Sequence, residues 1–442
     1  MLQDSQLGEA ADERLDHSFT RSFFRPYFDL GPAAPDAPYH LAGIEFFFRS
    51  LVEDKTYPHI QACFNPSFRE TLIRDTGLYE YDVESPPELD ESLKSARWKT
   101  LCELIDSFDA LPCRSQTRLA WTLSKLCFQH VAVDLIPPSC GERIGESDEL
   151  AGLAFVRCYS RYRMSVDDPG APSSANEFEK LATGSAPGIN RIDATYQMVV
   201  QNVKHAGDVE RAEAWQALHL RAIDAARPEL DDFTYLFVMS RYHRVGGFIP
   251  QMRRQAKAVV DEMELAERYA LELPRRDEVH RIAADEVLYP VLESRIKEAL
   301  WLKDNDLALE RAARLVKLSP SDSRAWLQLG EVQVEHERPD EALRAYRNAA
   351  RFAPPGREIA WFMAGQCYEA LDDLESACDA YLTSLEIDPF GIAAAELLQN
   401  AAQQLGHTAI LRWVQPRLAR LESLRAVAQP PRAWPYKHFP SP

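Results

Sequence analysis

The strongest constraint on the fold is a set of large, small and turn-forming residues that occurs twice between residues 326 and 389. The first set reads Trp326, Leu329, Gly330, Ala342, Tyr346, Ala349 and Pro354, and the second reads Trp361, Ala364, Gly365, Tyr368, Ala377, Tyr381, Ser384 and Pro389. The period is 35 residues (361 − 326), because Pro355 and Gly356 lengthen the connection. A fixed period of this size indicates supersecondary units that stack on their neighbours.

These residues resemble the tetratricopeptide repeat, a helix–turn–helix unit of about 34 residues. In that family Trp, Leu and Gly belong to the first helix, Ala and an aromatic residue belong to the second, and Pro closes the unit. The resemblance implies a stack of helical hairpins that binds other polypeptides and seldom catalyses a reaction.

Weaker copies flank the two clear ones. Residues 276–318 and the following Pro320 match the pattern at Ala308 and at that proline, but lack its Trp and Gly. Residues 392–420 keep little besides Gly406, as expected of a unit that caps the stack. The resemblance thus extends over residues 291–420, and a stack generally needs three or more units.

The sequence predicts a mostly α-helical protein, in which an N-terminal helical domain precedes an α-solenoid of helical hairpins ending in the repeats. One segment, Leu150–Met164, is open to two interpretations. Its alternating pattern suits a β-strand, but the same residues are nearly as compatible with an α-helix. The expected divisions are an acidic leader at 1–17, a mainly helical domain at 18–164, a Pro/Gly/Ser-rich linker or loop at 165–189, helical hairpins at 190–290, the repeats at 291–421 and a Pro- and aromatic-rich tail at 422–442.

Composition and charge narrow the classes of partner. The 442 residues carry a formal net charge of −18, which argues against general binding to the nucleic-acid phosphate backbone. No apolar run approaches the ~20 residues that a membrane helix needs, and the first 16 residues lack the apolar core of a secretion signal. The eight scattered cysteines suit reduced core thiols. We therefore expect a cytoplasmic protein without a cofactor, and the richness in Ala, Arg, Asp and Pro is typical of a bacterial one.

The resemblance also indicates a binding surface, because the first helix of each repeat lines a concave groove in this family. The residues that it places in the groove are Arg324, Leu327, Glu331, Glu335, Phe362, Gln366, Glu369, Glu396 and Asn400. We call these nine residues the groove set.

The groove set does not fit an acidic ligand. Family members that hold the acidic tails of chaperones use a clamp of Lys, Arg and Asn, whereas Leu327 with Glu331 and Phe362 with Gln366 occupy those positions here. We expect an apolar or basic segment of a partner protein, anchored on Phe362. Two alternatives are a groove filled by the N-terminal domain or tail of the same chain, and a solvated helix face without a binding role.

One constellation of residues suits nucleophilic catalysis. Cys127, His130 and Asp134 lie at i, i+3 and i+7 of a helix predicted for Ser115–Leu135, so their side chains share one face. A thiolate beside a carboxylate-oriented imidazole is an activated nucleophile. The more favoured interpretation is a core thiol with a hydrogen-bonded core histidine, since such groups seldom all come from one helix.

Two further groups of residues suggest ligand sites. Asp277 and His280 form one carboxylate-x-x-His pair, of the kind that dimetal helical bundles use in duplicate. The second pair is missing, which argues against a metal site of that kind. A basic cluster of two predicted helices suits phosphate or an acidic surface, although the polar faces of two helices explain it more simply. Its residues are Arg241, His243, Arg244, Arg253, Arg254 and Lys257.

The function that these patterns favour is a non-catalytic adaptor or scaffold, whose concave groove recognises a peptide segment of a partner. A second hypothesis is a bacterial enzyme in which residues 18–164 form an unrecognised catalytic domain and the repeats recruit its protein or peptide substrate. A third is a regulator whose groove is closed by its own C-terminal tail. The sequence contains no Gly-x-Gly-x-x-Gly, phosphate-binding Lys loop or His-Glu-x-x-His motif that would favour nucleotide or zinc chemistry.

Overall fold

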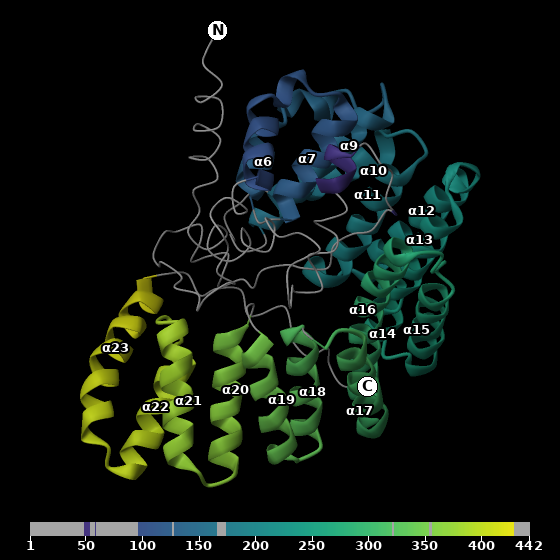
Figure 1. Ribbon diagram of the computed structural model, residues 1–442. Helices are drawn as coiled ribbons and strands as arrows, with labels where there is room; N and C mark the ends of the chain where they lie inside the picture. The colour runs from purple at the N-terminus through teal and green to yellow at the C-terminus, as the bar shows by residue number, and fades with distance from the viewer. Residues whose placement is uncertain are drawn as a thin grey trace. The chain divides into compact units, whose positions relative to one another are not determined.

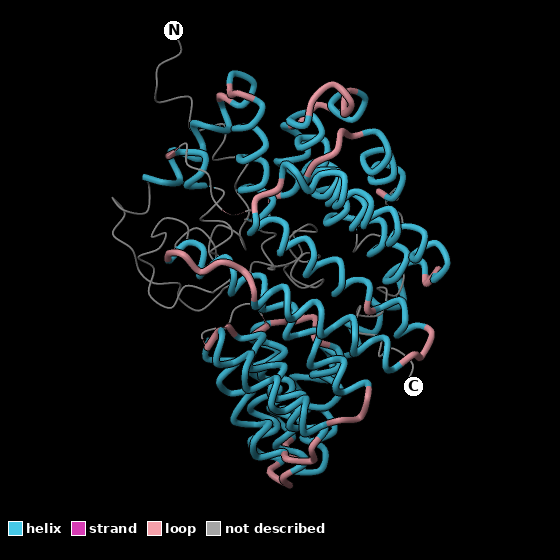
Figure 2. Tube along the Cα trace, turned by 90° about the vertical axis from the view of Figure 1, so that its right-hand side faces the viewer, coloured by secondary structure: helices cyan, strands magenta, loops and turns pink. Residues whose placement is uncertain are grey.

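The computed structural model describes residues 48–53, 58, 96–125, 128–165, 174–320, 322–352 and 356–427. Regular structure in these ranges is helical, without a strand (Figures 1 and 2). The predicted mostly α-helical class is therefore confirmed. The expected acidic leader lies outside the described residues, and so does the expected tail beyond Val427. Within the described ranges one compact unit ends at Ser294 and a second begins at Arg295.

The first unit consists of helices of very different lengths. They are α6 (Ala96–Asp106), η2 (Phe108–Ala110), α7 (Cys113–Lys125), α8 (Gln129–Leu135), η3 (Pro138–Glu142), α9 (Asp148–Ser165), α10 (Ala175–Gly184), α11 (Ile189–Val200), η4 (Gln201–Ala206), α12 (Val209–Ala226), η5 (Arg227–Glu229), α13 (Asp232–Gly246), α14 (Phe248–Met252) and α15 (Ala256–Leu271). Helix α16 (Glu278–Trp301) runs across the division into the second unit.

Helix α9 settles the ambiguous segment in favour of a helix, and the strand interpretation was wrong. α9 contacts α7, α8, α10 and α11, so it is surrounded by other helices. Neighbouring residues that an alternating strand would point to opposite faces are both buried, as Phe155 and Val156 illustrate. The rings of Trp121 and Tyr159 lie 5.3 Å apart in the same aromatic core.

Two segments of the first unit differ from the expected pattern. The single helix expected over 115–135 is two helices, because Phe128 has a non-helical backbone and donates its N–H to the carbonyl of Leu123. Within the range 165–189, where composition indicates a linker or loop, α10 is an ordered helix. Its Phe178 and Leu181 are buried, so a short apolar stripe stabilises a helix next to turn-rich sequence.

The second unit is a row of antiparallel helices (Figure 1). Its helices after α16 are α17 (Asn305–Leu318), α18 (Ser323–Glu335), α19 (Pro339–Phe352), α20 (Arg357–Ala370), α21 (Leu374–Ile387), α22 (Ile392–Leu405) and α23 (Thr408–Val427). From α17 to α23 each helix contacts the next along the chain, the pattern of an α-solenoid. α23 extends six residues beyond 421, the expected end of the repeats (427 − 421).

The turns inside the hairpins repeat as closely as the helices. A residue with left-handed backbone lies in each of them: Lys303 (φ 61°), Glu337 (φ 56°), Asp372 (φ 60°) and Gly406 (φ 71°). Their spacings are 34, 35 and 34 residues (337 − 303, 372 − 337 and 406 − 372). The same tight turn therefore recurs in the two clear repeats and in both weak copies, although only the last copy has glycine there.

Candidate functional site

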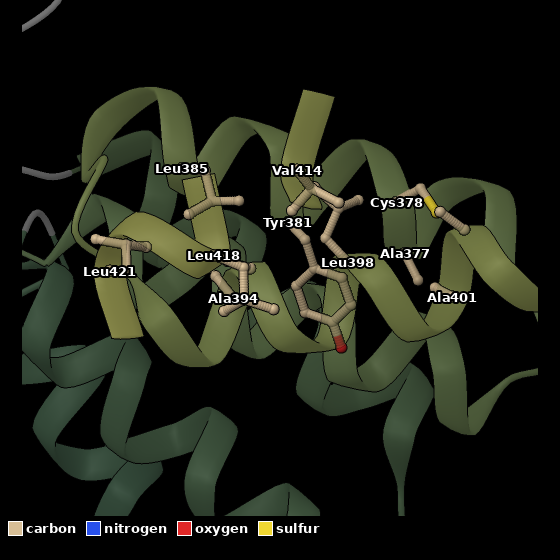
Figure 3. Close-up of a cluster of buried hydrophobic side chains, with 12 residues drawn as sticks. Ala377, Cys378, Tyr381, Leu385, Ala394, Leu398, Ala401, Val414, Leu418 and Leu421 are labelled. Atoms are coloured by element: carbon tan, nitrogen blue, oxygen red, sulfur yellow. The ribbon is translucent and has the colours of Figure 1, made fainter. Parts of the chain in front are cut away.

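The two clear repeats are held together by a glycine that lies against a tyrosine. Gly330 on α18 faces Tyr346 on α19, and Gly365 on α20 faces Tyr381 on α21; a Cβ on either glycine would overlap the ring. The absence of a side chain thus lets the paired helices approach closely. Figure 3 shows Tyr381 among the buried side chains that α22 and α23 contribute, such as Leu398 and Val414.

The two tyrosines differ in what their hydroxyl groups contact. The Tyr381 hydroxyl donates a hydrogen bond of 2.9 Å to the Glu369 carboxylate, whereas the buried Tyr346 hydroxyl has no hydrogen-bond partner in the described part of the chain. Burial raises the pKa of both phenols, so both stay protonated.

This difference predicts opposite effects of one substitution at two equivalent positions. Tyr381→Phe should lower the free energy of unfolding of the second unit by about 1 kcal/mol, because a hydrogen bond to a carboxylate is lost. Tyr346→Phe should be neutral or stabilising, because it removes an unpaired buried hydroxyl. Urea unfolding of the two variants and the wild type gives both values, and equal losses would contradict the assignment.

The groove set lies on the first helix of each hairpin, α18, α20 and α22. Glu335, Gln366, Glu396 and Asn400 are exposed, while the other five members are half-buried. The most exposed large apolar side chain on these helices, at 43%, is Val334, next to Glu335 on α18. The solvent-facing part of the groove set is therefore acidic or amidic, with an apolar side chain beside it.

The half-buried members have contacts inside the repeats. Arg324 forms an ion pair with Asp322, the residue that caps the N-terminus of α18, at 2.6 Å. Glu331 accepts a hydrogen bond of 2.9 Å from the Gln328 amide. The side chains of these residues, like that of Glu369, stabilise the repeats through contacts within them and are already occupied by those contacts.

Phe362 combines exposure with packing. Its ring centroid lies 6.0 Å from that of Tyr381, and the side chain packs against the buried cluster formed by α21, α22 and α23. Leu327 packs in the same way against the clusters around Tyr346 and Ala349. Both side chains are partly structural, so truncating either one alone would disturb the stack as well as the surface.

The structure describes two of the three residues proposed for nucleophilic catalysis. Cys127 lies outside the described residues, and His130 and Asp134 lie on the short helix α8, where Asp134 is exposed. Because α7 ends at Lys125 and α8 begins at Gln129, the single continuous helix on which the predicted spacing depended is not present. Burial raises the pKa of the described thiols Cys113, Cys140, Cys158, Cys367 and Cys378, which disfavours their reactive thiolate form.

Asp277 has a structural role at the start of α16. Its carboxylate accepts a hydrogen bond of 2.9 Å from the His280 backbone N–H and lies 2.8 Å from His280 Nδ1. These hydrogen bonds lower the pKa of Asp277. This is the geometry of an N-cap, which explains the carboxylate-x-x-His spacing without a metal. Among the described residues no three metal-binding side chains come together.

The structure differs most from the sequence prediction at the basic cluster. Arg241 is buried at 5% exposure and is not on a polar helix face. Its Nη1 lies 2.5 Å from Oδ1 of Asp193, which is also buried. Arg253 and Lys257 remain at the surface in ion pairs with Glu213 and Asp261. No local pattern could have revealed the buried pair, since its members are 48 residues apart.

Comparison with known proteins supports the repeats directly. A tetratricopeptide-repeat family model matches residues 296–357 and 327–392. A search of curated proteins finds no match.

No helix in the described ranges is both long and apolar enough to span a membrane.

Three solved structures are similar to this chain. PilF of Pseudomonas aeruginosa is 15% identical with a TM-score of 0.37, covering 54% of this chain and 97% of its own. YrrB, described as a repeat protein of this kind with an unusual peptide-binding site, is 20% identical with a TM-score of 0.32, covering 50% and 97%. A tetratricopeptide-repeat protein of Parabacteroides merdae is 10% identical with a TM-score of 0.38, covering 67% and 98%.

Proposed function

We propose that this chain, whose residues 296–392 are tetratricopeptide repeats, is a protein-interaction adaptor that binds a basic and apolar segment of a partner along α18, α20 and α22. The repeats support a role in protein interaction in general. The choice of surface and the character of the partner are our inference from the side chains on that surface.

The observation that carries the proposal is the set of side chains left unused on the first helices. Glu335, Gln366, Glu396 and Asn400 are exposed, and within the described residues their side chains form no hydrogen bond or ion pair. They recur on three successive hairpins, so an extended segment crossing the hairpins would meet them in order. A polar rim around an apolar centre is the usual anatomy of an interface.

Charge favours a basic partner on this surface. Glu335 and Glu396 both bring negative charge, and the chain as a whole carries −18. A basic segment would be steered toward such a surface, and an acidic one would be repelled. Val334 and the exposed part of Phe362 supply apolar area for an adjacent side chain of the partner.

The test changes exposed residues that have no structural contact. In Glu335→Lys/Glu396→Lys, two side chains of the proposed surface reverse their charge. We expect the purified partner, first identified by capture with the wild-type chain and mass spectrometry, to bind this variant at least about tenfold more weakly, which corresponds to about 1.4 kcal/mol.

A matched control reverses two charges elsewhere in the same unit. Glu310 and Glu386 are exposed on α17 and α21, the second helices of their hairpins, so Glu310→Lys/Glu386→Lys makes the same change in net charge. The control should retain wild-type affinity. Equal affinity for all three proteins would place the binding surface elsewhere, and equal loss in both variants would indicate a general charge effect.

A further inference from the structure

The first unit contains a cluster of cations near the buried carboxylate of Asp193. This cluster lies outside the repeats. It consists of Asp193 and Tyr196 on α11, Lys204 in η4, and Arg241 and Arg244 on α13; we call it the α11–α13 cluster. Helix α11 contacts both η4 and α13, so the five residues come from adjoining elements.

Arg241 is the innermost cation of the cluster. Its guanidinium carbon lies 3.9 Å from the centroid of the Tyr196 ring, and its Nη1 contacts Asp193 at 2.5 Å. Its Nε and Nη2 are buried and have no hydrogen-bond partner among the residues that the structure describes. A buried charged donor without an acceptor is costly, so these two N–H groups indicate a missing acceptor next to Arg241.

The three cations of the cluster differ in their exposure to solvent. Lys204 is exposed, Arg244 is half-buried and Arg241 is buried. Arg244 donates from Nη2 to the Tyr196 hydroxyl at 3.1 Å, and Tyr196 in turn stacks under Arg241. The positive charge of the cluster therefore continues from the surface to the unpaired guanidinium nitrogens.

The electrostatic balance around Tyr196 is strongly positive. Burial by itself raises the pKa of a phenol, yet Arg244, Arg241 and Lys204 hold the pKa of Tyr196 below its usual value. Asp193 is the carboxylate paired within the cluster. The nearby Glu262 is bonded instead to His243 at 2.9 Å. Three cations, Arg241, Arg244 and Lys204, therefore act together on Tyr196.

The backbone beside the cluster has the irregularity that often accompanies binding sites. Residues 201–206 form a π-helical turn directly after α11, and this turn carries Lys204. Such turns are rare and are found frequently at functional sites. This observation is independent of the unpaired guanidinium nitrogens.

We propose that the α11–α13 cluster is a binding site for an oxyanion group, a carboxylate or a phosphate, of a small ligand. The oxygen atoms of the ligand would accept hydrogen bonds from Nε and Nη2 of Arg241, and Lys204 and Arg244 would attract it from solvent. This site is separate from the repeat surface, so its fate does not depend on the proposed adaptor role.

The test is calorimetric titration of the full-length chain with inorganic phosphate, and separately with acetate, at pH 7 and constant ionic strength. We expect saturable binding of one of the two anions. The better anion identifies the group, phosphate or carboxylate. Arg244→Gln and Lys204→Gln should each weaken binding at least tenfold, and neither change removes the buried ion pair.

The control is Lys257→Gln, which removes one exposed positive charge that is paired with Asp261 at 2.7 Å on α15. This variant should bind the anion as tightly as the wild type. The proposal is overturned if neither anion binds saturably, which would leave ordered water as the acceptor for Arg241, or if Lys257→Gln loses as much affinity as the cluster variants.

Discussion

Replacing Asp193 by alanine should lower the free energy of local unfolding around α11 and α13 by about 3–5 kcal/mol. The reason is the position of the ion pair: the side chains of Arg241 and Asp193 are 6% and 3% exposed. Without the carboxylate, the guanidinium stays buried and loses the counter-charge of Asp193. Native-state hydrogen exchange of the α11 and α13 amides measures the change directly.

Two comparisons separate this effect from a general loss of charge. Asp261→Ala breaks the exposed pair with Lys257 and should cost less than about 1 kcal/mol, because solvent screens such pairs. Asp193→Ala/Arg241→Met removes both buried charges and should recover most of the loss. A cost below about 1 kcal/mol for Asp193→Ala would mean that Arg241 readily reaches solvent or another carboxylate, contrary to its burial.

The repeats were predictable because their determinants are local. Gly330 and Tyr346 contact each other and are only 16 residues apart (346 − 330), and the same pair recurs one period later. The residues that determine the hairpin geometry therefore occur twice in the sequence, at positions that can be aligned with each other. The left-handed turns at Lys303, Glu337 and Asp372 were harder to recognise, since none of these residues has the freedom of glycine.

The first unit was harder to predict because its contacts join distant parts of the chain. The alternating pattern of α9 also suits a strand, and its burial against several helices explains why neighbouring residues such as Phe155 and Val156 are both apolar. α10 is short and lies next to a Pro- and Gly-rich stretch, so composition concealed it. Arg241 looked like a surface residue because its partner Asp193 is far away in sequence.

The location of the groove set in the fold was predicted in part. The resemblance placed its residues on the first helix of each hairpin, where the structure has them, but it could not distinguish those that contact solvent from those that stabilise the repeats. Glu369 binds the Tyr381 hydroxyl and Arg324 pairs with Asp322, whereas Gln366 and Asn400 remain exposed. That distinction depends on side-chain contacts between neighbouring helices, and it determines which substitutions test binding without disturbing the fold.

Acidification should destabilise the first unit through His219 by about 2 kcal/mol between pH 7 and pH 5. Burial, reinforced by the charge of Arg241, lowers the pKa of His219 from its ordinary value of 6.5 to about 3. The folded imidazole stays neutral in this range, while the unfolded one takes up a proton below pH 6.5. The stabilisation is therefore fully present above pH 6.5 and is lost progressively as the pH falls toward 3.

The variant His219→Asn should remove this component of the pH dependence. Thr195 donates its hydroxyl to the backbone carbonyls of Arg191 and Ile192, so the contact of 2.9 Å with His219 Nδ1 is one in which the imidazole donates. An asparagine amide supplies the same donor without titrating. The measurement is the free energy of opening of α11 and α12 by hydrogen exchange at pH 7 and pH 5. His407→Asn, at a partly exposed histidine, serves as the control and should keep the wild-type slope. An unchanged slope in His219→Asn would show that His219 is not the titrating group. That result would favour a path by which water reaches the buried Nε2 of His219.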